Sequence, residues 1–423
     1  MSLLLKLSEP DTVSSFISKK QDVQKSSQRE LDEMTILLKN PETERILREL
    51  SAGDHKFPIP YRMEISKIGS SKKRVVYTFD RYEKTSLKLL GFLLRDYDHI
   101  FSDNLYSYRS SIGSRDAVRR LHHLEGLEKM FVLKTDIHDY FNSIDVDILL
   151  TDLRRVMYDD IPLYETFRNL LDDDQSLWKG DIVHGPRGAM AGMPVSPFLA
   201  NLYLDGLDRL FDGSSITYCR YADDILLAAP SEQKLSDARG ALYDFIRKKK
   251  LEINPDKSVY YRPGEPFDFL GFRISKVSID LCPSTIKKIK GKISRRCRSS
   301  RRWYLYNDLG PEKGIKGAIT IMNRKFYGHG DNGELSWDLW YLPVLTTDAS
   351  LRMIDRYFEE ELRSIPTGKH NRRNYKITSY EHLRECGFKP LVRRYHEIRD
   401  GDEYYDPIPA VKKQQKENTE EIS

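Results

Sequence analysis

Cysteine is scarce in this chain of 423 residues, and the four cysteines, Cys219, Cys282, Cys297 and Cys386, are widely separated. Because no Cys-x-x-Cys pair occurs, the sequence predicts neither a disulfide framework nor a zinc site, and it fits a reducing, cytoplasmic setting. No apolar run approaches the roughly 18 residues of a membrane span. The N-terminal segment is interrupted too soon for a signal peptide. We therefore expect a globular protein with no membrane partner.

Two further absences exclude common classes of enzyme. No glycine-rich loop of the type G-x-x-x-x-G-K-[ST] occurs, so an NTP-driven motor is not expected. The ten histidines are isolated from one another or adjacent, and they form no spaced set of metal ligands. A Ser-His or Cys-His nucleophile cannot be assembled from local spacing.

The positive charge is unevenly distributed, although the net charge is only +5. Residues 287–302 contain no acidic residue, and aromatic residues follow directly at Trp303, Tyr304 and Tyr306. Such a basic stretch beside aromatics is typical of segments that follow a phosphate backbone and stack on bases. The alternative is a solvated helical face. The basic residues are Lys287, Lys288, Lys290, Lys292, Arg295, Arg296, Arg298, Arg301 and Arg302.

The tetrapeptide Tyr221-Ala222-Asp223-Asp224 lies between two short apolar runs, 216–220 and 225–229, that are typical of strands. The pattern predicts a tight hairpin that presents two adjacent carboxylates. These carboxylates repel each other, and Mg²⁺ would relieve that repulsion because it binds one or two carboxylates together with substrate phosphates. An ordinary acidic turn is the alternative interpretation.

A third carboxylate, Asp136, stands where the apolar run 131–135 meets a turn. If the two strand regions are neighbours, Asp136 converges with Asp223 and Asp224. Three such carboxylates can hold two metal ions about 3.5–4 Å apart, which activate the attacking and leaving oxygens of an in-line displacement. In phosphoryl transfer the protein mainly positions groups and neutralises charge. Alternatively, Asp136 only caps a following helix.

These and other segments resemble the prokaryotic reverse transcriptases, in the family's order and over roughly residues 55–275. The further matching segments are the fingers strand pair 65–76, the template-contacting segment 106–118, the loop and helix 188–201, the last palm motif 251–258 and the primer grip 267–272. The resemblance implies an α+β right-hand polymerase, with fingers and an antiparallel palm sheet followed by a helical thumb and a C-terminal extension. It also implies an RNA-directed DNA polymerase.

The resemblance assigns roles around the reacting phosphate. Two Mg²⁺ ions, for which Mn²⁺ could substitute, would bind Asp136, Asp223, Asp224 and the backbone carbonyl of Ile137. Lys257 would protonate the leaving pyrophosphate as a general acid. The alternative for this lysine is an exposed turn residue.

The incoming deoxynucleotide would contact a second set of residues. Lys67 and Arg74 would bind its triphosphate, and Phe141 matches the ring that collides with a ribose 2′-hydroxyl. The alternative for Phe141 is a core aromatic. Where the family commonly shows Pro-Gln-Gly, this chain shows Met190-Ala191-Gly192, so a methyl group replaces the Gln that braces the nucleotide. The change leaves the expected metal site intact and bears on fidelity, substrate preference or priming.

Nucleic acid would contact Arg109 and Ser196 in the palm and fingers, and the basic residues of the thumb. The thumb residues assigned in this way are Lys287, Lys288, Arg295, Arg296, Arg298, Arg301 and Arg302.

The predicted organisation has four parts. Residues 1–55 form an N-terminal helical extension, 56–275 the fingers and palm, and 276–398 a helical thumb and C-terminal nucleic-acid-binding region. Residues 399–423 form a charged tail that we expect to be disordered. Apolar spacing predicts helices over 85–95 and 197–211.

The altered Pro-Gln-Gly block and the helical C-terminal extension resemble the defence-associated bacterial reverse transcriptases. The chain also lacks Cys-rich, His-Asn-His and Val-Thr-Gly elements. The resemblance implies protection against phage, with dNTPs as substrates and cDNA as the product of copying a structured non-coding RNA from the same locus. Open alternatives are an intron-type or retron-type enzyme, an untemplated or protein-primed polymerase, an RNA-dependent RNA polymerase and a non-catalytic RNA-binding scaffold. No motif specifies an oligomeric state.

Overall fold

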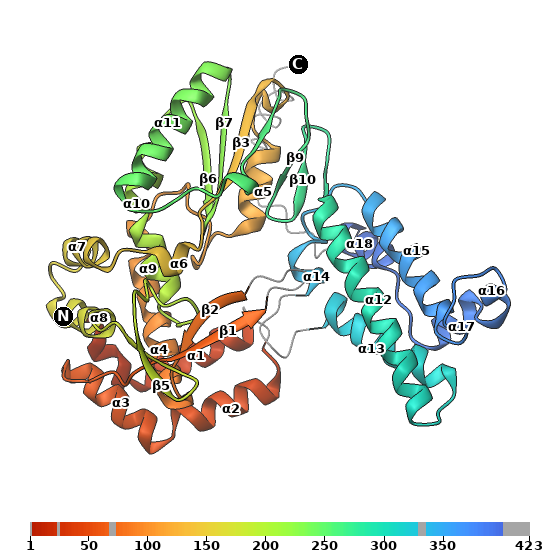
Figure 1. Ribbon diagram of the computed structural model, residues 1–423, viewed down its shortest axis with the longest axis horizontal. Helices are drawn as coiled ribbons and strands as arrows, with labels where there is room; N and C mark the ends of the chain where they lie inside the picture. The colour runs from red at the N-terminus through yellow and green to blue at the C-terminus, as the bar shows by residue number, and fades with distance from the viewer. Residues whose placement is uncertain (1, 23–25, 67–72, 329–335, 401–423) are drawn as a thin grey trace, which may run out of the picture. The chain divides into compact units, whose positions relative to one another are not determined.

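The computed structural model describes residues 2–22, 26–66, 73–328 and 336–400, and it divides into two compact units (Figure 1). The first unit extends to Cys282, and the second begins at Pro283. Within the described residues, the first unit contains the strands and the second is helical.

The first unit begins with a layer of helices: η1 (Leu3–Ser8), α1 (Pro10–Asp22), α2 (Gln28–Leu38) and α3 (Pro41–Ala52). Local sequence fixes their ends. Ser27 and Glu30 form a capping box at the start of α2, Asn40 caps α3, and Gly53 ends α3 with φ +78. The layer packs on α4 (Arg81–Leu93), which 3-10 helix η2 (Leu94–Ile100) extends.

The fingers contain a four-stranded sheet in the order β2-β1-β4-β5. Strands β1 (Tyr61–Ser66) and β2 (Lys73–Thr78) are antiparallel, with Ile65 opposite Arg74. Strand β4 (Gln175–Trp178) joins β1 in parallel and pairs with β5 (Asp181–His184) as a hairpin. The helices between the fingers and palm strands are α5 (Ser114–His122), η3 (Leu127–Lys129), α6 (Tyr140–Ser143), α7 (Val146–Val156) and α8 (Ile161–Leu171).

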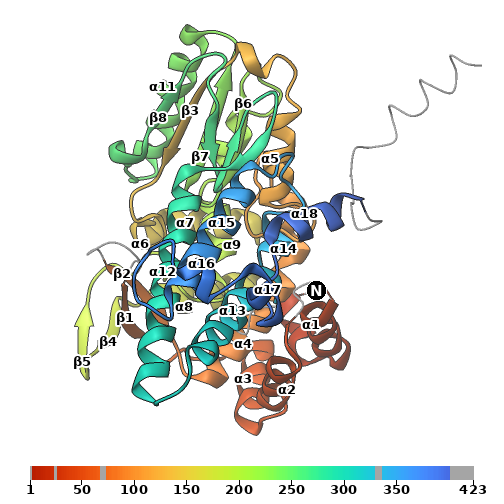
Figure 2. The same cartoon turned by 90° about the vertical axis from the view of Figure 1, so that its right-hand side faces the viewer.

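The palm is a second four-stranded sheet in the order β6-β7-β3-β8, and all of its pairs are antiparallel. Its strands are β6 (Thr217–Tyr221), β7 (Asp224–Ala229), β3 (Phe131–Asp136) and β8 (Val259–Tyr261). Helix α11 (Glu232–Lys248) packs along β7 and β3 (Figures 1 and 2). This sheet confirms the predicted α+β right-hand fold with an antiparallel palm.

The remaining elements of the first unit are short. Helices α9 (Ser196–Tyr203) and α10 (Asp205–Leu210) confirm the helical spacing predicted over 197–211, and α4 confirms that over 85–95. The 3-10 helix η4 (Pro255–Lys257) precedes β8. Strands β9 (Phe267–Phe269), β10 (Phe272–Ile274) and β11 (Ile279–Leu281) form a small sheet, with α5 packed against β10.

The second unit is built around α12 (Pro283–Tyr306), which packs against α13 (Pro311–Tyr327) and α15 (Ala349–Ser364). Its buried side chains, including Ile289, Ile293, Cys297 and Tyr304, recur at intervals of three or four residues and line one face of the helix. Trp337 is buried against Phe326 and forms part of the core of this unit. The shorter helices are α14 (Trp337–Trp340), α16 (Asn374–Ile377), α17 (Tyr380–Glu385) and α18 (Leu391–Asp400).

Within the described part of the chain, all four cysteines are buried and none forms a disulfide, and no helix is long and apolar enough to cross a membrane. The predicted disordered tail lies almost wholly outside the described residues.

Candidate functional site

Three carboxylates meet at one end of the palm sheet. Asp136 is the last residue of β3 and lies directly opposite Asp224, the first residue of β7. Directly opposed residues of an antiparallel pair project from the same face of the sheet, with Cα atoms about 4.5–5.5 Å apart. Asp223 occupies the turn that joins β6 to β7. The strand register therefore brings together the three residues that the sequence predicted.

The turn has an unusual backbone. Ala222 takes φ +56, a left-handed conformation that costs a non-glycine residue about 1–2 kcal/mol. Two neighbouring segments hold it in place: the N–H of Ile137, just after β3, donates to the carbonyl of Asp223 at 3.2 Å, and the N–H of Tyr106 donates to the carbonyl of Arg220 at 2.9 Å. Strain held by surrounding structure is typical of functional sites.

Behind the turn lies a fully buried ion pair between Arg220 of β6 and Asp208 of α10. The Nε of Arg220 donates to Oδ1 of Asp208 at 2.7 Å, and its Nη2 donates to Oδ2 at 2.5 Å. The same guanidinium donates to the carbonyls of Ala222 and Asn201. Arg220 thus ties the strained turn to the helices below it, a role that sequence reasoning missed. The sequence signal that could have revealed this role was an arginine within a segment whose pattern is typical of a buried strand.

The carboxylates are electrostatically coupled. Burial, followed by the charges of Asp136 and Asp224, raises the pKa of Asp223 to about 6. Burial also raises the pKa of Asp224, against the opposing effect of Lys134, whose Nζ lies 3.5 Å from Oδ1 of Asp224. Lys257 donates to Oδ2 of Asp136 at 2.6 Å. The cluster therefore favours nearby positive charge.

This donor set fits divalent cations, because carboxylate oxygens are the ligands that Mg²⁺ prefers. Within the described residues, however, no group of three or more Asp, Glu, His or Cys side chains is gathered closely enough to hold a metal ion. Lys257 and Lys134 contact two of the carboxylates and would have to turn aside to free their oxygens. The carbonyl of the buried residue Ile137 stays a predicted ligand.

The predicted nucleotide contacts lie on β2 and on the loop before α9. Arg74 is exposed on β2, and its positive charge acts on the hydroxyl of Tyr108, which is also close enough to Asp223 to feel its charge. The carbonyl of Ala191 accepts from the N–H of Tyr77 at 2.7 Å. Gly192 has φ +101, and a Cβ there would lie 3.0 Å from the carbonyl oxygen of Tyr77. Lys67 lies outside the described residues.

The same loop contacts Phe141. The N–H of Ala189 donates to the carbonyl of Phe141 at 2.8 Å, and a Cβ on Gly188 would collide with that oxygen. The half-buried ring of Phe141 packs edge-on against Tyr108. The ring of Tyr108 also lies 6.2 Å from that of Tyr221, centroid to centroid. Tyr108, at φ +58, belongs to the segment 106–118 predicted to contact the template, but its packing against Phe141 was not predicted.

Two predicted nucleic-acid contacts have internal partners. The guanidinium of Arg109 donates to the carbonyls of Ser102 and Asp98. The hydroxyl of buried Ser196 donates to the carbonyls of Ala189 and Met190, which fixes the loop before α9. Both side chains brace the backbone of their own domain, and direct contact with nucleic acid stays a prediction.

The basic residues predicted for the thumb all lie on α12. Lys287, Lys288, Arg295, Arg298 and Arg302 are exposed, opposite the apolar face that packs on α13 and α15. The two others are half-buried: Arg296 and Arg301. A long exposed stripe of positive charge is compatible with the predicted phosphate contacts.

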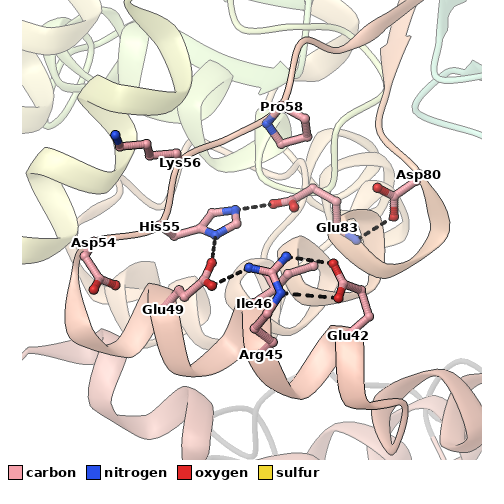
Figure 3. A pocket seen from close by; sticks show the side chains of 10 residues that line it. All are labelled: Glu42, Arg45, Ile46, Glu49, Asp54, His55, Lys56, Pro58, Asp80 and Glu83. Carbon is pink, nitrogen blue, oxygen red and sulfur yellow. Dashed lines mark hydrogen bonds and ion pairs between the residues drawn. The ribbon is translucent and has the colours of Figure 1, made fainter.

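A pocket of about 470 Å³ in the first unit lies between α3 and the start of α4 (Figure 3). Its centre is His55, whose ring nitrogens bond Glu49 and Glu83, each at 2.9 Å. Arg45 pairs with Glu42 and Glu49 (Figure 3). These side chains pair with one another, and no palm carboxylate lines the pocket. We therefore interpret the pairs around His55 as a structural link between α3 and α4.

An antiparallel palm sheet with three carboxylates at one end, in a chain with fingers and a helical second unit, is the arrangement of a right-hand nucleic-acid polymerase. The family described as reverse transcriptase (RNA-dependent DNA polymerase) matches residues 65–274. The chain belongs to the reverse transcriptases through this domain, and it is an RNA-directed DNA polymerase of the prokaryotic type.

Two bacterial relatives are retron reverse transcriptases. The Retron Ec86 reverse transcriptase of Escherichia coli is 28% identical over 286 residues, which are 63% of this chain and 82% of the relative. The Retron Mx65 reverse transcriptase of Myxococcus xanthus is 29% identical over 143 residues, 31% of this chain and 33% of the relative. Among solved structures, apo telomerase from Candida tropicalis matches at 12% identity and TM-score 0.43, covering 80% of this chain and 68% of that one. A likeness at that level is too weak to assign function.

Proposed function

We propose that this reverse transcriptase copies a structured non-coding RNA into DNA by metal-assisted phosphoryl transfer, with two Mg²⁺ ions, in bacterial antiphage defence. The observation that supports the chemistry most directly is the register of the palm sheet, with Asp136 opposite Asp224 and Asp223 in the adjoining turn. Burial, together with the neighbouring carboxylates, raises the pKa of Asp223 and Asp224, and a bound cation would favour their ionised forms.

The chain's own residues divide the remaining work. Asp136, Asp223 and Asp224 hold the two ions, which when bound activate the attacking oxygen and stabilise the leaving one. Arg74 binds the triphosphate, and Phe141 excludes a ribose 2′-hydroxyl. Lys257, whose Nζ already lies within this cluster, donates a proton to the leaving pyrophosphate.

The assignment to defence rests on the resemblance to the defence-associated enzymes, in particular on Met190-Ala191-Gly192 in place of Pro-Gln-Gly. A retron-type enzyme is the second candidate. It is favoured by the Escherichia coli relative, most of whose length this chain covers.

The test compares wild type with Asp223→Ala/Asp224→Ala, each expressed from the native locus. RNA and DNA that co-purify are sequenced, and phage plating is measured in the same strains. We expect one RNA species with both proteins, complementary DNA with wild type alone, and protection that the double variant loses. Removing the metal ligands should lower synthesis by more than about 10³-fold while RNA binding persists. An exposed adjacent pair, Asp172→Ala/Asp173→Ala, is the matched control and should behave as wild type.

Full activity in the Asp223/Asp224 double variant would reject the site. DNA without a matching RNA would reject templated copying, and unchanged plating would reject the defence role. DNA joined to its own RNA template would favour the retron-type candidate.

A further inference from the structure

A small pocket of about 180 Å³ lies on the N-terminal layer of the first unit, between α1 and α4. Four cationic side chains line it, two from α1 and two from α4 and the segment after it. They surround two phenylalanine rings. The residues are Lys19, Lys20, Lys88 and Arg95, with Phe16 and Phe92.

The phenylalanines hold the cations in place. The rings of Phe16 and Phe92 meet edge-on, with centroids 5.5 Å apart. Lys20 lies over the ring of Phe16, with its Nζ 5.2 Å from the centroid, and Lys19 and Arg95 each lie 5.8 Å from the centroid of Phe92. Because such cation–π interactions are attractive, the positive groups are fixed around the pocket and not free to disperse.

Carboxylates near the pocket are committed elsewhere. Asp98 accepts hydrogen bonds from the N–H and the hydroxyl of Ser110, and Glu30 closes the capping box of α2. Within the described part of the chain, none of Lys19, Lys88 and Arg95 lies within ion-pair distance of a carboxylate. Among the described residues, no ion pair therefore neutralises Lys19, Lys88 or Arg95, although the charges of Asp98 and Glu30 reach them from a distance.

The pKa values agree with this geometry. Burial lowers the pKa of Lys19, Lys88 and Arg95. Neighbouring cations lower it further for the two lysines, since Arg95 acts on Lys19 and Lys20 acts on Lys88. The smaller, opposing effects of Asp98 on Lys19 and Arg95 and of Glu30 on Lys88 offset this only in part. A bound anion would remove both penalties, because it replaces lost solvation and offsets like-charge repulsion.

The pocket also touches the loop that carries Ala191 and Gly192. Pro194 of that loop lines the pocket. Gly91 of α4 lies so close that a Cβ there would be 3.0 Å from the carbonyl oxygen of Pro194. An occupant of the pocket would therefore rest against the same loop whose other residues pack on β2 and on Phe141.

We propose that the pocket binds a backbone phosphate of the template RNA strand. Pockets for whole cofactors and nucleotides usually measure about 300–1,000 Å³, so this one suits a phosphate group better than a nucleotide. Four cations around a small cavity match the charge of a polyanionic strand. That the bound strand is the template rests on the proposed function. That the pocket binds an RNA phosphate is independent of it.

The experiment titrates a labelled single-stranded RNA oligonucleotide against the full chain at several salt concentrations. The variant Lys19→Gln/Lys88→Gln/Arg95→Gln should bind RNA roughly threefold to tenfold more weakly, with a salt slope shallower by about 0.7 for each phosphate that is no longer neutralised. The control Lys6→Gln/Arg29→Gln/Arg48→Gln removes equal charge from exposed positions of the same helical layer and should bind like wild type. Lys88→Arg should retain binding, and thermal melting checks that each variant is folded.

Equal weakening by the control would overturn the proposal, as would an unchanged affinity and slope in the pocket variant. Binding of ATP alone, measured on the same proteins, separates the sources of phosphate. Weakened ATP binding with unchanged RNA affinity would overturn the assignment to a strand. These titrations need no catalysis. If the wild type binds RNA but incorporates no dNTP, the proposed function is rejected. The pocket proposal is then still tested by the RNA affinities of the pocket variant and its control.

Discussion

The ring of Tyr108 stands edge-on to the ring of Phe141, with centroids 6.4 Å apart and planes at 76°. Tyr108 has a left-handed backbone, φ +58, so its ring direction is fixed by the chain as well as by its neighbours. Phe141 is therefore supported from the side, as a residue must be if its ring is to exclude a substrate by collision.

Phe141→Ala should admit ribonucleotides. We expect the preference for dNTPs over rNTPs to fall by about tenfold to a hundredfold, measured as the ratio of kcat/KM values, because the collision with the 2′-hydroxyl is removed. Tyr108→Ala should lower the preference by less, since the gate stays but loses its support. Robust rNTP incorporation by wild type would refute the gate assignment.

Gly192→Ala should destabilise the loop before α9. The new methyl group would meet the carbonyl oxygen of Tyr77 at 3.0 Å, at a residue with φ +101. We expect a loss of about 1–3 kcal/mol in the free energy of unfolding and a raised KM for dNTPs. The matched control is Gly240→Ala in α11, where a Cβ has nothing within 4 Å. There the exchange should stabilise the protein by about 1 kcal/mol. Denaturant unfolding measures both.

Charge reversal on α12 should weaken binding of nucleic acid. Arg295→Glu/Arg296→Glu/Arg298→Glu is expected to lower affinity for a template–primer duplex, with a salt slope shallower by about 0.9 for each phosphate that is no longer neutralised. The control makes an equal charge change on other helices of the same unit, at Lys313, Lys316 and Arg393. It should leave the affinity and the salt slope as in wild type. An unchanged slope in the α12 variant would remove α12 from the binding surface.

His55 should make stability depend on pH. Burial lowers its pKa, but the hydrogen bonds that the protonated ring donates to the carboxylates of Glu83 and Glu49 outweigh that effect, so the pKa lies above the ordinary value of 6.5. The protonated ring then stabilises the fold fully below pH 6.5, and this contribution is lost as the pH rises through the raised pKa. We expect the free energy of unfolding to fall over this range in wild type and to stay flatter in His55→Gln. His184→Gln, at an exposed histidine, should follow wild type. A flat wild-type curve would contradict the prediction.

The palm hairpin was predictable because its sequence is locally unambiguous. Strands expected at 216–220 and 225–229 are found at Thr217–Tyr221 and Asp224–Ala229, since apolar residues on both sides of a two-residue turn leave few alternatives. The convergence of Asp136 with the hairpin was predicted only on the condition that the two strand regions are neighbours, and the pairing of β3 with β7 meets that condition.

Roles that depend on distant partners could not be predicted. Arg109 and Ser196 were expected to contact nucleic acid, and their described partners are backbone carbonyls. A polar side chain that donates hydrogen bonds to backbone carbonyls of its own protein cannot be distinguished in the sequence from one that binds a ligand. The pocket around Lys19 and Lys88 was missed for a related reason: its cations come from helices far apart in the chain and form no basic run.

Two lysines lie against the palm carboxylates in the folded chain, where metal ions are proposed to bind. Lys257 and Lys134 supply positive charge to Asp136 and Asp224 within the folded chain, so the hairpin does not depend on an ion to offset its acids. In a zinc finger, by contrast, the apoprotein is unfolded. If the ions bind as proposed, their binding would follow folding and would exchange one set of positive charges, the lysines, for another.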